Sequence, residues 1–443
     1  MSQLWKISAL VLAVVLAGLA QPQTPDPVAV ARQALDLLLA GQYTQLRELF
    51  NPQMLQAATE ESLRTTVGSM IQSLGKPVNI GEPIVQHVQN MTIVIFPVQF
   101  PHGDPAHGLP PNLNVLLPVD PTGKLAGLRF TPTEPPPQAQ QQWTPAAYVN
   151  PAAFHNRQVT VGEGQWRLPG TLSIPNGPGP FPAVVLVQGS GPHDRDETVG
   201  ANKPFRDIAE GLASRGIAVL RYDKRTLVYG PQMAAIPNFT VNQETIDDAL
   251  KALALLRSQP EINQNRIFLL GHSLGGYLAP RIAEEAPYLA GVIIMAGTTR
   301  PIEDVMLEQM RYLGAPPAQI AQVQQQAQEI HNLKSAEGPP ILNAPRSYWL
   351  DLNNYNPEAT VGKLHCRILV LQGARDYQVT QSNYAGWQAA LKNDPKATFH
   401  LYPSLNHLFI AGQGPSTPAE YERPGHVAPE VINDIATWIK QQP

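Results

Sequence analysis

The sequence has 443 residues and a formal net charge of −4, a length that suits about two or three domains with a substantial core. Hydrophobic residues make up 43% and charged residues 15%, so the composition excludes a chain that is disordered throughout. The slight acidic excess argues against a nucleic-acid partner, since such proteins usually carry a basic excess. Cys366 is the single cysteine, which excludes an internal disulfide and a zinc site built from cysteines.

Residues 1–20 have the pattern of a secretory signal peptide. Lys6 precedes an apolar run that ends at Ala20, and the small residues near that end suit cleavage. The run is shorter than the roughly 20 residues that a membrane-spanning helix needs. We therefore expect cleavage and export to the periplasm or the extracellular space, with no stable insertion into a membrane afterwards.

Residues 26–132 are expected to form a small α+β domain. Asp26 followed by Pro27 predicts a helix start, and apolar residues at helical spacing lead from there to Gly41, a typical helix end. Two further helices are expected over residues 43–50 and 59–74. Alternating or continuous apolar residues then predict strands over 84–88, 92–96 and 113–119. Helices followed by strands are typical of the α+β class.

This first part of the chain shows no catalytic constellation. His87, His102 and His107 are scattered over a strand and a loop, which favours surface or packing roles for them. Residues 133–154 begin with a proline-rich stretch followed by glutamines, a composition that predicts an extended, semi-rigid linker.

Residues 155–443 alternate short apolar runs with helical patterns. Thr240 and Gln243 make a capping box before one helix. Continuous runs rich in β-branched residues, flanked by helices, indicate parallel strands buried on both faces. The runs lie at 183–187, 217–220, 267–270, 292–295 and 368–371. We therefore predict a doubly wound α/β domain with a mostly parallel sheet.

The motif Gly271-His-Ser-Leu-Gly275 comes directly after the run at 267–270 and directly before a helical pattern. This is the G-x-S-x-G elbow in the strand–turn–helix context that it requires. The glycines give room where the strand and the helix crowd a strained turn, and the turn exposes the serine hydroxyl. Ser273 is therefore the candidate nucleophile.

A serine hydroxyl needs a base to take its proton and an acid to orient that base. In this fold class the acid and then the histidine follow the serine along the chain. Asp376 comes just after the run at 368–371 and is the candidate acid. Glu303 and Asp304, after the preceding strand, are the rival acids.

His407 follows the next strand pattern, over residues 397–402, on a loop and is the candidate base. His400 lies inside that strand, and His426 lies close to the last helix. His272 is adjacent to the serine, so local geometry is expected to point it elsewhere.

An acyl-transfer site also needs donors for the oxyanion. The backbone N–H of Leu274, the residue after the nucleophile, is one candidate. The second is the N–H of Ser190 in the loop after residues 183–187, where glycines let the backbone approach a substrate. A plain turn is the alternative interpretation of that loop.

Residues 155–443 resemble the serine α/β-hydrolases of the bacterial carboxylesterase and serine-aminopeptidase type, and residues 26–132 resemble the small amino-terminal domain of that group. The motifs that carry the resemblance are Gly-Ser-Gly-Pro-His-Asp-Arg-Asp196, Arg-Tyr-Asp-Lys-Arg225, Gly-His-Ser-Leu-Gly275, Ala-Gly-Thr-Thr-Arg300, Gly-Ala-Arg-Asp376 and Asn-His407. The resemblance implies the triad Ser273, Asp376 and His407. Gln188 departs from it, because many relatives have histidine there.

The charged motif residues Asp194, Asp196, Asp223 and Arg225 are expected to form structural ion pairs around the site. Arg300 either lines the pocket or caps its loop.

A helical insertion is expected over about 300–362. This stretch is longer than a plain crossover between strands needs, and two helical patterns lie within it, one over 306–313 and one over 320–333. Met and Leu on these helices suit the lining of a lid for an acyl group. The alternative is that their apolar faces only pack on the core.

The sequence thus predicts an α/β-hydrolase fold carrying a serine esterase that cleaves small-molecule carboxylic esters through an acyl-enzyme. This chemistry requires no cofactor and no metal. Two alternatives stay open, a serine peptidase acting on short peptides and a non-catalytic binding protein on a hydrolase scaffold.

Overall fold

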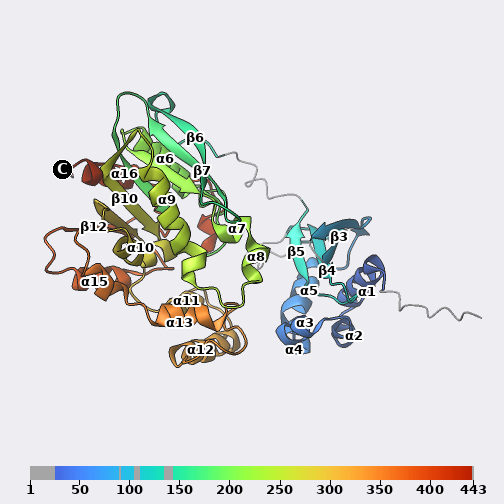
Figure 1. The fold of residues 1–443 in the computed structure, drawn as a ribbon. Helices are drawn as coiled ribbons and strands as arrows, with labels where there is room; N and C mark the ends of the chain where they lie inside the picture. Colours follow the sequence, from blue (N-terminus) through green and yellow to red (C-terminus); the bar gives the residue numbers. More distant parts are fainter. Residues whose placement is uncertain (1–24, 89–90, 104–109, 134–142, 442–443) are drawn as a thin grey trace, which may run out of the picture. The chain divides into compact units, whose positions relative to one another are not determined.

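The computed structural model describes residues 25–88, 91–103, 110–133 and 143–441 (Figure 1). The chain forms two compact units that divide between Pro137 and Gln138. The expected signal peptide and His107 lie outside the described residues, as do residues 134–142 of the expected linker. Along the described part of the chain, no helix has both the length and the apolar character needed to cross a bilayer.

The first unit packs short helices against an antiparallel sheet. Its helices are α1 Pro27–Leu39, α2 Tyr43–Glu48, α3 Pro52–Ala57, α4 Glu60–Ser62, the π-helix Leu63–Val67 and α5 Gly68–Leu74. Its strands are β1 Asn79–Ile80, β2 Ile84–Val88, β3 Met91–Gln99, β4 Asn112–Val119 and β5 Arg129–Pro132. The sheet order is β1-β3-β4-β5, with β2 also paired to β3. Leu35 and Leu38 of α1 are fully buried in a core that includes Phe96 of β3.

Helix α3 was not expected from the sequence, although its start carries a clear signal. The Asn51 side chain accepts a hydrogen bond from the Met54 N–H at 2.9 Å, and Pro52 occupies the first turn. This is the same arrangement of capping acceptor and proline that marks the start of α1. The expected helix over 59–74 is present but is interrupted by the π-helical turn at 63–67.

The second unit is built on an eight-stranded sheet in the order β13-β12-β11-β10-β8-β9-β7-β6. The strands are β6 Phe154–Val161, β7 Leu168–Pro175, β8 Phe181–Val187, β9 Ala218–Tyr222, β10 Ile262–His272, β11 Gly291–Met295, β12 Arg367–Gly373 and β13 Ala397–Tyr402. Strands β8 to β13 run parallel, and β7 pairs antiparallel with both β9 and β6. The predicted α/β class with a mostly parallel sheet is confirmed.

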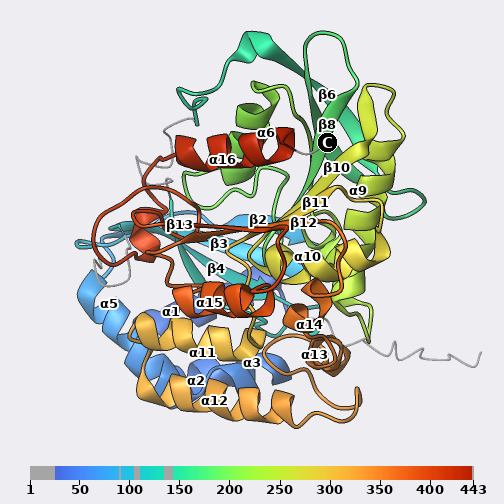
Figure 2. The same cartoon turned by 90° about the vertical axis from the view of Figure 1, so that its left-hand side faces the viewer.

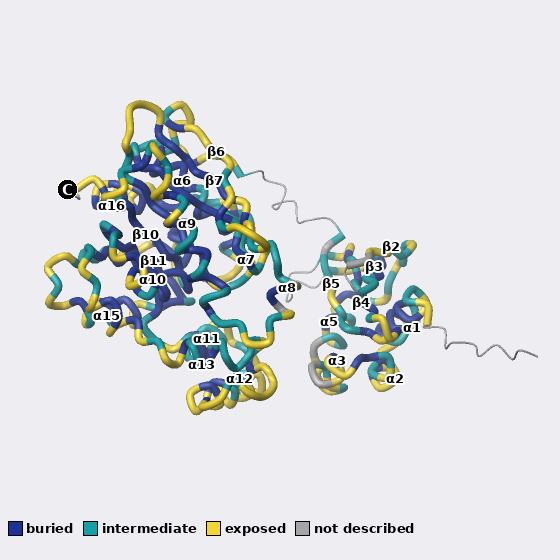
Figure 3. Tube along the Cα trace, in the orientation of Figure 1, coloured by how far each residue is buried: buried dark blue, intermediate teal, exposed yellow. Residues whose placement is uncertain are grey.

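Helices cover both faces of this sheet. Figure 2 shows α6 Pro204–Ala213 and α16 Pro429–Lys440 together on one face. The other face carries α9 Asp247–Arg257, α10 Leu274–Glu285 and α15 Gln381–Ala390. Each face has its own apolar cluster, so the central strands are buried along their length (Figure 3). The segment between β9 and α9 adds α7 Arg225–Val228, α8 Gly230–Ala234 and the π-helix Asn242–Ile246.

Four helices are inserted between β11 and β12. They are α11 Ile302–Tyr312, α12 Pro317–His331, α13 Arg346–Asn353 and α14 Pro357–Val361. Val305, Leu307 and Ile330 are buried, and Leu307's neighbour Met306 packs against the main core cluster. Each of the two expected helices thus has apolar residues that pack on the core, Met306 on α11 and Ile330 on α12, while Leu313 after α11 is exposed.

Residues 143–153, the end of the stretch expected as a linker, lie against the second unit. The Tyr148 hydroxyl donates to the Val427 carbonyl at 2.9 Å, and the Arg206 guanidinium lies 4.0 Å from the centre of the Trp143 ring. These contacts fix this stretch to α6 and to the segment before α16.

Candidate active site

Ser273 occupies the sharp turn between β10 and α10. Its backbone has φ 54° and ψ −115°, in the positive-φ region that is strained for a residue other than glycine. Its N–H donates to the Met295 carbonyl of β11 at 2.9 Å. A Cβ at Gly271 would lie 2.1 Å from the Gly275 oxygen, and one at Gly275 would lie 2.2 Å from the Val187 oxygen. Both glycines are therefore required sterically.

Asp376 and His407 form a buried pair on the loops after β12 and β13. The Asp376 Oδ2 atom lies 2.7 Å from the His407 Nδ1 atom, and both residues are at most 5% exposed. The other carboxylate oxygen accepts the N–H groups of Gln378 at 2.8 Å and Val379 at 2.9 Å. Since a carboxylate only accepts, His407 Nδ1 carries a proton and Nε2 presents a lone pair.

Ser273 and His407 line one pocket of about 270 Å³. Its lining comes from the loop after β8, from the elbow and from the loops after β12 and β13. The lining residues are Gly189, Ser190, His193, Glu197, Val199, His272, Ser273, Tyr377, Gln378, His407, Leu408, Pro418 and Tyr421. The structure thus brings the predicted nucleophile, base and oxyanion loop to one place at the carboxyl edge of the sheet.

The rival acids and two of the rival histidines have other partners. Glu303 and Asp304 face the His331 Nε2 atom at 3.2 and 3.3 Å, and burial raises the pKa of Glu303. Arg300 and Glu303 line a different pocket of about 390 Å³ that does not include Ser273.

His400 pairs with Asp434 at 3.3 Å, and His426 pairs with Asp207 at 3.0 Å. Asp376 is therefore the carboxylate that the fold places on His407.

His272 was expected to point away from the site, and that expectation is wrong. It lines the pocket, with its ring centre 4.7 Å from that of His407. Its Nε2 donates to the His407 carbonyl at 3.0 Å, and its Nδ1 lies 3.0 Å from the Glu197 Oε2 atom. Both ring nitrogens therefore face oxygen atoms that can accept a hydrogen bond. The elbow turn brings His272 and the loop after β13 together, which spacing along the sequence does not reveal.

In the buried pair of His272 and Glu197, each charge shifts the pKa of the other group. Burial by itself lowers the pKa of His272, but the Glu197 carboxylate, the His407 carbonyl and the Asp376 carboxylate together raise it above its usual value. Burial likewise disfavours the charged form of Glu197, yet the His272 charge holds the pKa of Glu197 below its usual value. Each group of the pair therefore favours the charged form of the other.

The loop after β8 is held through its backbone on two sides. The Gly189 N–H donates to the Glu197 Oε1 atom at 2.6 Å, and the Gly189 carbonyl accepts from the Lys224 ammonium at 2.8 Å. Gln188, which stands where many members of the resembling family have histidine, donates through its amide to the Tyr222 carbonyl. Gln188 thereby anchors the start of the loop to β9.

Leu274 is the first residue of α10. The first N–H groups of a helix have no acceptor within the helix, so its N–H is free to meet a ligand at the elbow. Ser190 is an exposed residue of the neighbouring loop. Among the described residues, no protein group accepts the N–H of either residue.

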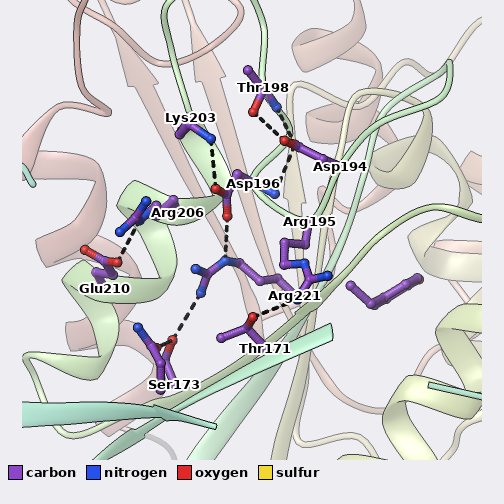
Figure 4. Close-up of polar contacts among 12 residues, drawn as sticks. Thr171, Ser173, Asp194, Arg195, Asp196, Thr198, Lys203, Arg206, Glu210 and Arg221 are labelled. Carbon is purple, nitrogen blue, oxygen red and sulfur yellow. Dashed lines mark hydrogen bonds and ion pairs between the residues drawn. The ribbon is translucent and has the colours of Figure 1, made fainter. Parts of the chain in front are cut away.

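Three of the four residues expected to form ion pairs around the site do so, and Figure 4 shows the pairs of Asp196. The Asp196 carboxylate accepts from Arg221 at 2.9 Å and from Lys203 at 3.1 Å. Asp223 pairs with Arg195 at 2.8 Å. These pairs fix the loop between β8 and α6 to the neighbouring strand β9.

The other two residues expected to form ion pairs are Arg225 and Asp194. Arg225 pairs with the buried Asp248 at 2.8 Å. Asp194 is held instead by hydrogen bonds from the Thr198 backbone at 2.9 Å and hydroxyl at 2.7 Å (Figure 4). Asp194 therefore shapes a turn rather than an ion pair.

Helix α11 reaches the wall of the pocket. The Tyr312 ring stacks on Tyr377 with centres 5.0 Å apart, and the Gln309 amide donates to the Gln378 carbonyl at 3.0 Å. Arg300, at the start of the insertion, pairs with Glu308 of the same helix. The inserted helices thus support the loop that carries Asp376.

Over the described residues, no group of three or more His, Cys, Asp or Glu side chains is arranged to hold a metal ion. The polar groups of the pocket are instead engaged with one another, as the Asp376–His407 and Glu197–His272 pairs show.

A mainly parallel sheet, a serine at a strand–helix elbow and a bonded aspartate–histidine pair on later loops define the α/β-hydrolase class. Residues 204–424 match the prolyl oligopeptidase family. Esterase EstD of Thermotoga maritima is 40% identical over 330 residues, which are 74% of this chain and 76% of that protein. The chain belongs to the serine α/β-hydrolases of the esterase type.

More distant similarities accompany this match. Acyl-coenzyme A thioesterase 1 of Mus musculus is 27% identical over 300 residues, 65% of this chain and 64% of that protein. The solved structure of Est1E from Butyrivibrio proteoclasticus is 17% identical, with a TM-score of 0.44, over 64% of this chain and 98% of that chain.

Proposed function

We propose that the protein hydrolyses small-molecule carboxylic esters through an acyl-enzyme on Ser273, with His407 as base and Asp376 as acid. The observation that carries the proposal is the buried 2.7 Å bond between Asp376 and His407 beside the serine elbow. The esterase name of the 40% identical relative also supports it.

In the proposed reaction, His407 Nε2 takes the Ser273 hydroxyl proton while the serine oxygen attacks the ester carbonyl. The N–H groups of Ser190 and Leu274 stabilise the oxyanion of the tetrahedral intermediate. The intermediate collapses, and the alcohol leaves with the proton from His407. Water activated by the same histidine then attacks the acyl-enzyme and releases the carboxylic acid. Asp376 holds the imidazole in its tautomer and stabilises the imidazolium.

A peptidase acting on short peptides is the second candidate, favoured by the match to the prolyl oligopeptidase family. Assays of short p-nitrophenyl esters beside aminoacyl anilides separate the two. We expect ester turnover that Ser273→Ala lowers about 10⁶-fold in kcat. Anilide turnover without ester turnover would reject the proposal, and absence of both in the folded chain would favour a binding protein.

We also propose that residues 1–20 direct export and are removed, and that the inserted helices act as a lid. Lys6 and the apolar run after it support export. Mass spectrometry of the protein from a periplasmic or culture fraction tests this proposal, and an uncleaved start would contradict it.

The stacking of Tyr312 on Tyr377, a pocket residue, supports the lid. Tyr312→Ala is expected to change KM for long-chain esters more than for short-chain ones, and equal effects would contradict the lid.

A further inference from the structure

A buried lysine lies against the loop that carries Ser190. Lys224 is 2% exposed, and its ammonium donates to the Gly189 carbonyl at 2.8 Å and to the Glu244 carboxylate at 2.6 Å. Burying two charges is costly, and apolar replacements of such pairs are often neutral or stabilising. We therefore expect this pair to have a role other than stabilising the fold. The bond from Lys224 to the Gly189 carbonyl places that role at the loop after β8.

The geometry of one peptide group links Lys224 to the oxyanion donor. The bond between Gly189 and Ser190 is trans, since the cis bond of the described chain is at Gly179-Pro180. In a planar trans peptide the C=O and the N–H point in opposite directions. With the Gly189 oxygen held on Lys224, the Ser190 N–H points away from the lysine. Gly189 and Ser190 both line the pocket, and Lys224 does not.

The neighbouring peptide is fixed from the other side. The Gly189 N–H donates to Glu197 at 2.6 Å, and Glu197 is buried on His272. A Cβ at Gly189 would lie 3.1 Å from the Ser273 Cβ, so the loop backbone touches the serine. The loop that carries Glu197 is itself held by Asp196 on Arg221 and Lys203 (Figure 4).

We infer that Lys224 is a positioning residue for the reaction, acting through the Gly189 carbonyl to aim the Ser190 N–H at the oxyanion. The lysine also polarises this peptide, because a hydrogen bond to its carbonyl strengthens the donor at its other end. Glu244 neutralises the lysine in the core. The inference rests on the proposed function, since it assigns a role within that reaction.

The test uses the double variant Lys224→Met/Glu244→Gln, which removes the pair without leaving a lone buried charge. On a short p-nitrophenyl ester we expect kcat to fall about 10²-fold, the loss that removal of one oxyanion donor causes, with KM little changed. A trifluoromethyl ketone, whose adduct on serine carries an oxyanion, is expected to bind more weakly by the same factor as the fall in kcat/KM.

The chain offers a matched control in Arg225→Met/Asp248→Asn. Arg225 follows Lys224 directly and is equally buried at 2%. It pairs with Asp248 of α9 and, within the described chain, makes no bond to the loop. The control should keep the kcat of the wild type. If the double variant does not fold, Lys224→Met/Glu244→Met, which removes the same donor and fills the site with apolar groups, takes its place with the same expected losses.

An unchanged kcat and unchanged ketone affinity in the Lys224 variants would overturn the inference. Equal losses in the control pair, or a change confined to KM, would overturn it as well. Ser273→Ala keeps the two proposals distinguishable: if that variant retained ester hydrolysis, the proposed function itself would fail, whatever the Lys224 variants did.

Discussion

Backbone N–H groups orient the side chain of Asp376, the proposed acid. Two N–H groups, of Gln378 and Val379, hold one oxygen, which leaves the other on His407. Asp376→Asn keeps the shape but can favour the wrong histidine tautomer. We expect a loss of about 10⁴-fold in kcat with little change in the melting temperature. Steady-state kinetics and thermal unfolding check this, and a loss below about tenfold would contradict the role of Asp376.

The His272–Glu197 pair predicts a pH dependence of stability. The pKa of His272 is raised, so its contribution is complete below the ordinary value of 6.5 and is lost as pH rises through the raised value. The pKa of Glu197 is lowered, so its contribution is complete above the ordinary value of 4.5 and is lost as pH falls through the lowered value. The stabilisation by the pair is therefore greatest between these ordinary values.

Glu197→Gln tests this dependence. The difference in melting temperature between wild type and Glu197→Gln should peak at mildly acidic pH and shrink toward alkaline and strongly acidic pH. Thermal unfolding followed by circular dichroism across pH measures it. A difference that grows steadily toward alkaline pH would show that the two groups do not favour each other's charged forms.

Among single residues, the sequence allowed us to predict the candidate roles of those that lie in a recognisable motif or directly after a predicted strand. Ser273, Asp376 and His407 each follow a strand of the parallel part of the sheet, and the carboxyl ends of parallel strands meet at one edge. Glu197 and Lys224 escaped prediction because their partners are backbone groups of Gly189 and side chains distant along the chain. Spacing carries no signal for such contacts.

At the scale of elements, the inserted helices are held by apolar packing. Ile330 of α12 is fully buried, while Leu313 after α11 is 48% exposed. Ile330→Ala should lower the free energy of unfolding by about 2–5 kcal/mol, because it leaves a cavity. Leu313→Ala should change it by less than about 0.5 kcal/mol. Urea denaturation measures both, and equal effects would contradict the packing.

Strands with two buried faces were found from the sequence because they are continuous apolar runs. Strands β6 and β7 were missed for a physical reason. Strand β6 lies at the sheet edge, and the residues between its two buried ends are exposed or half-buried, so it lacks such a run. Its antiparallel neighbour β7 contains Pro169 and Gly170, residues that disfavour a strand prediction.

At the scale of the whole molecule, the two compact units have separate cores. Leu38 is fully buried in the core of the first unit, which contains no residue of the second. Leu38→Ala should destabilise the first unit by about 2–5 kcal/mol and leave ester kinetics unchanged, because the proposed site lies in the second unit. Calorimetry should show one transition lowered and another unmoved. A single transition lowered as a whole would contradict independent cores.

The central claim concerns the hydroxyl of Ser273, and covalent labelling tests it most directly. A fluorophosphonate reacts with an activated serine and mimics acylation. Mass spectrometry of the treated protein should find one adduct, on the peptide that contains Ser273, in step with the loss of ester hydrolysis. Full ester hydrolysis with Ser273 unlabelled, or an adduct at another residue that abolishes activity, would contradict the account.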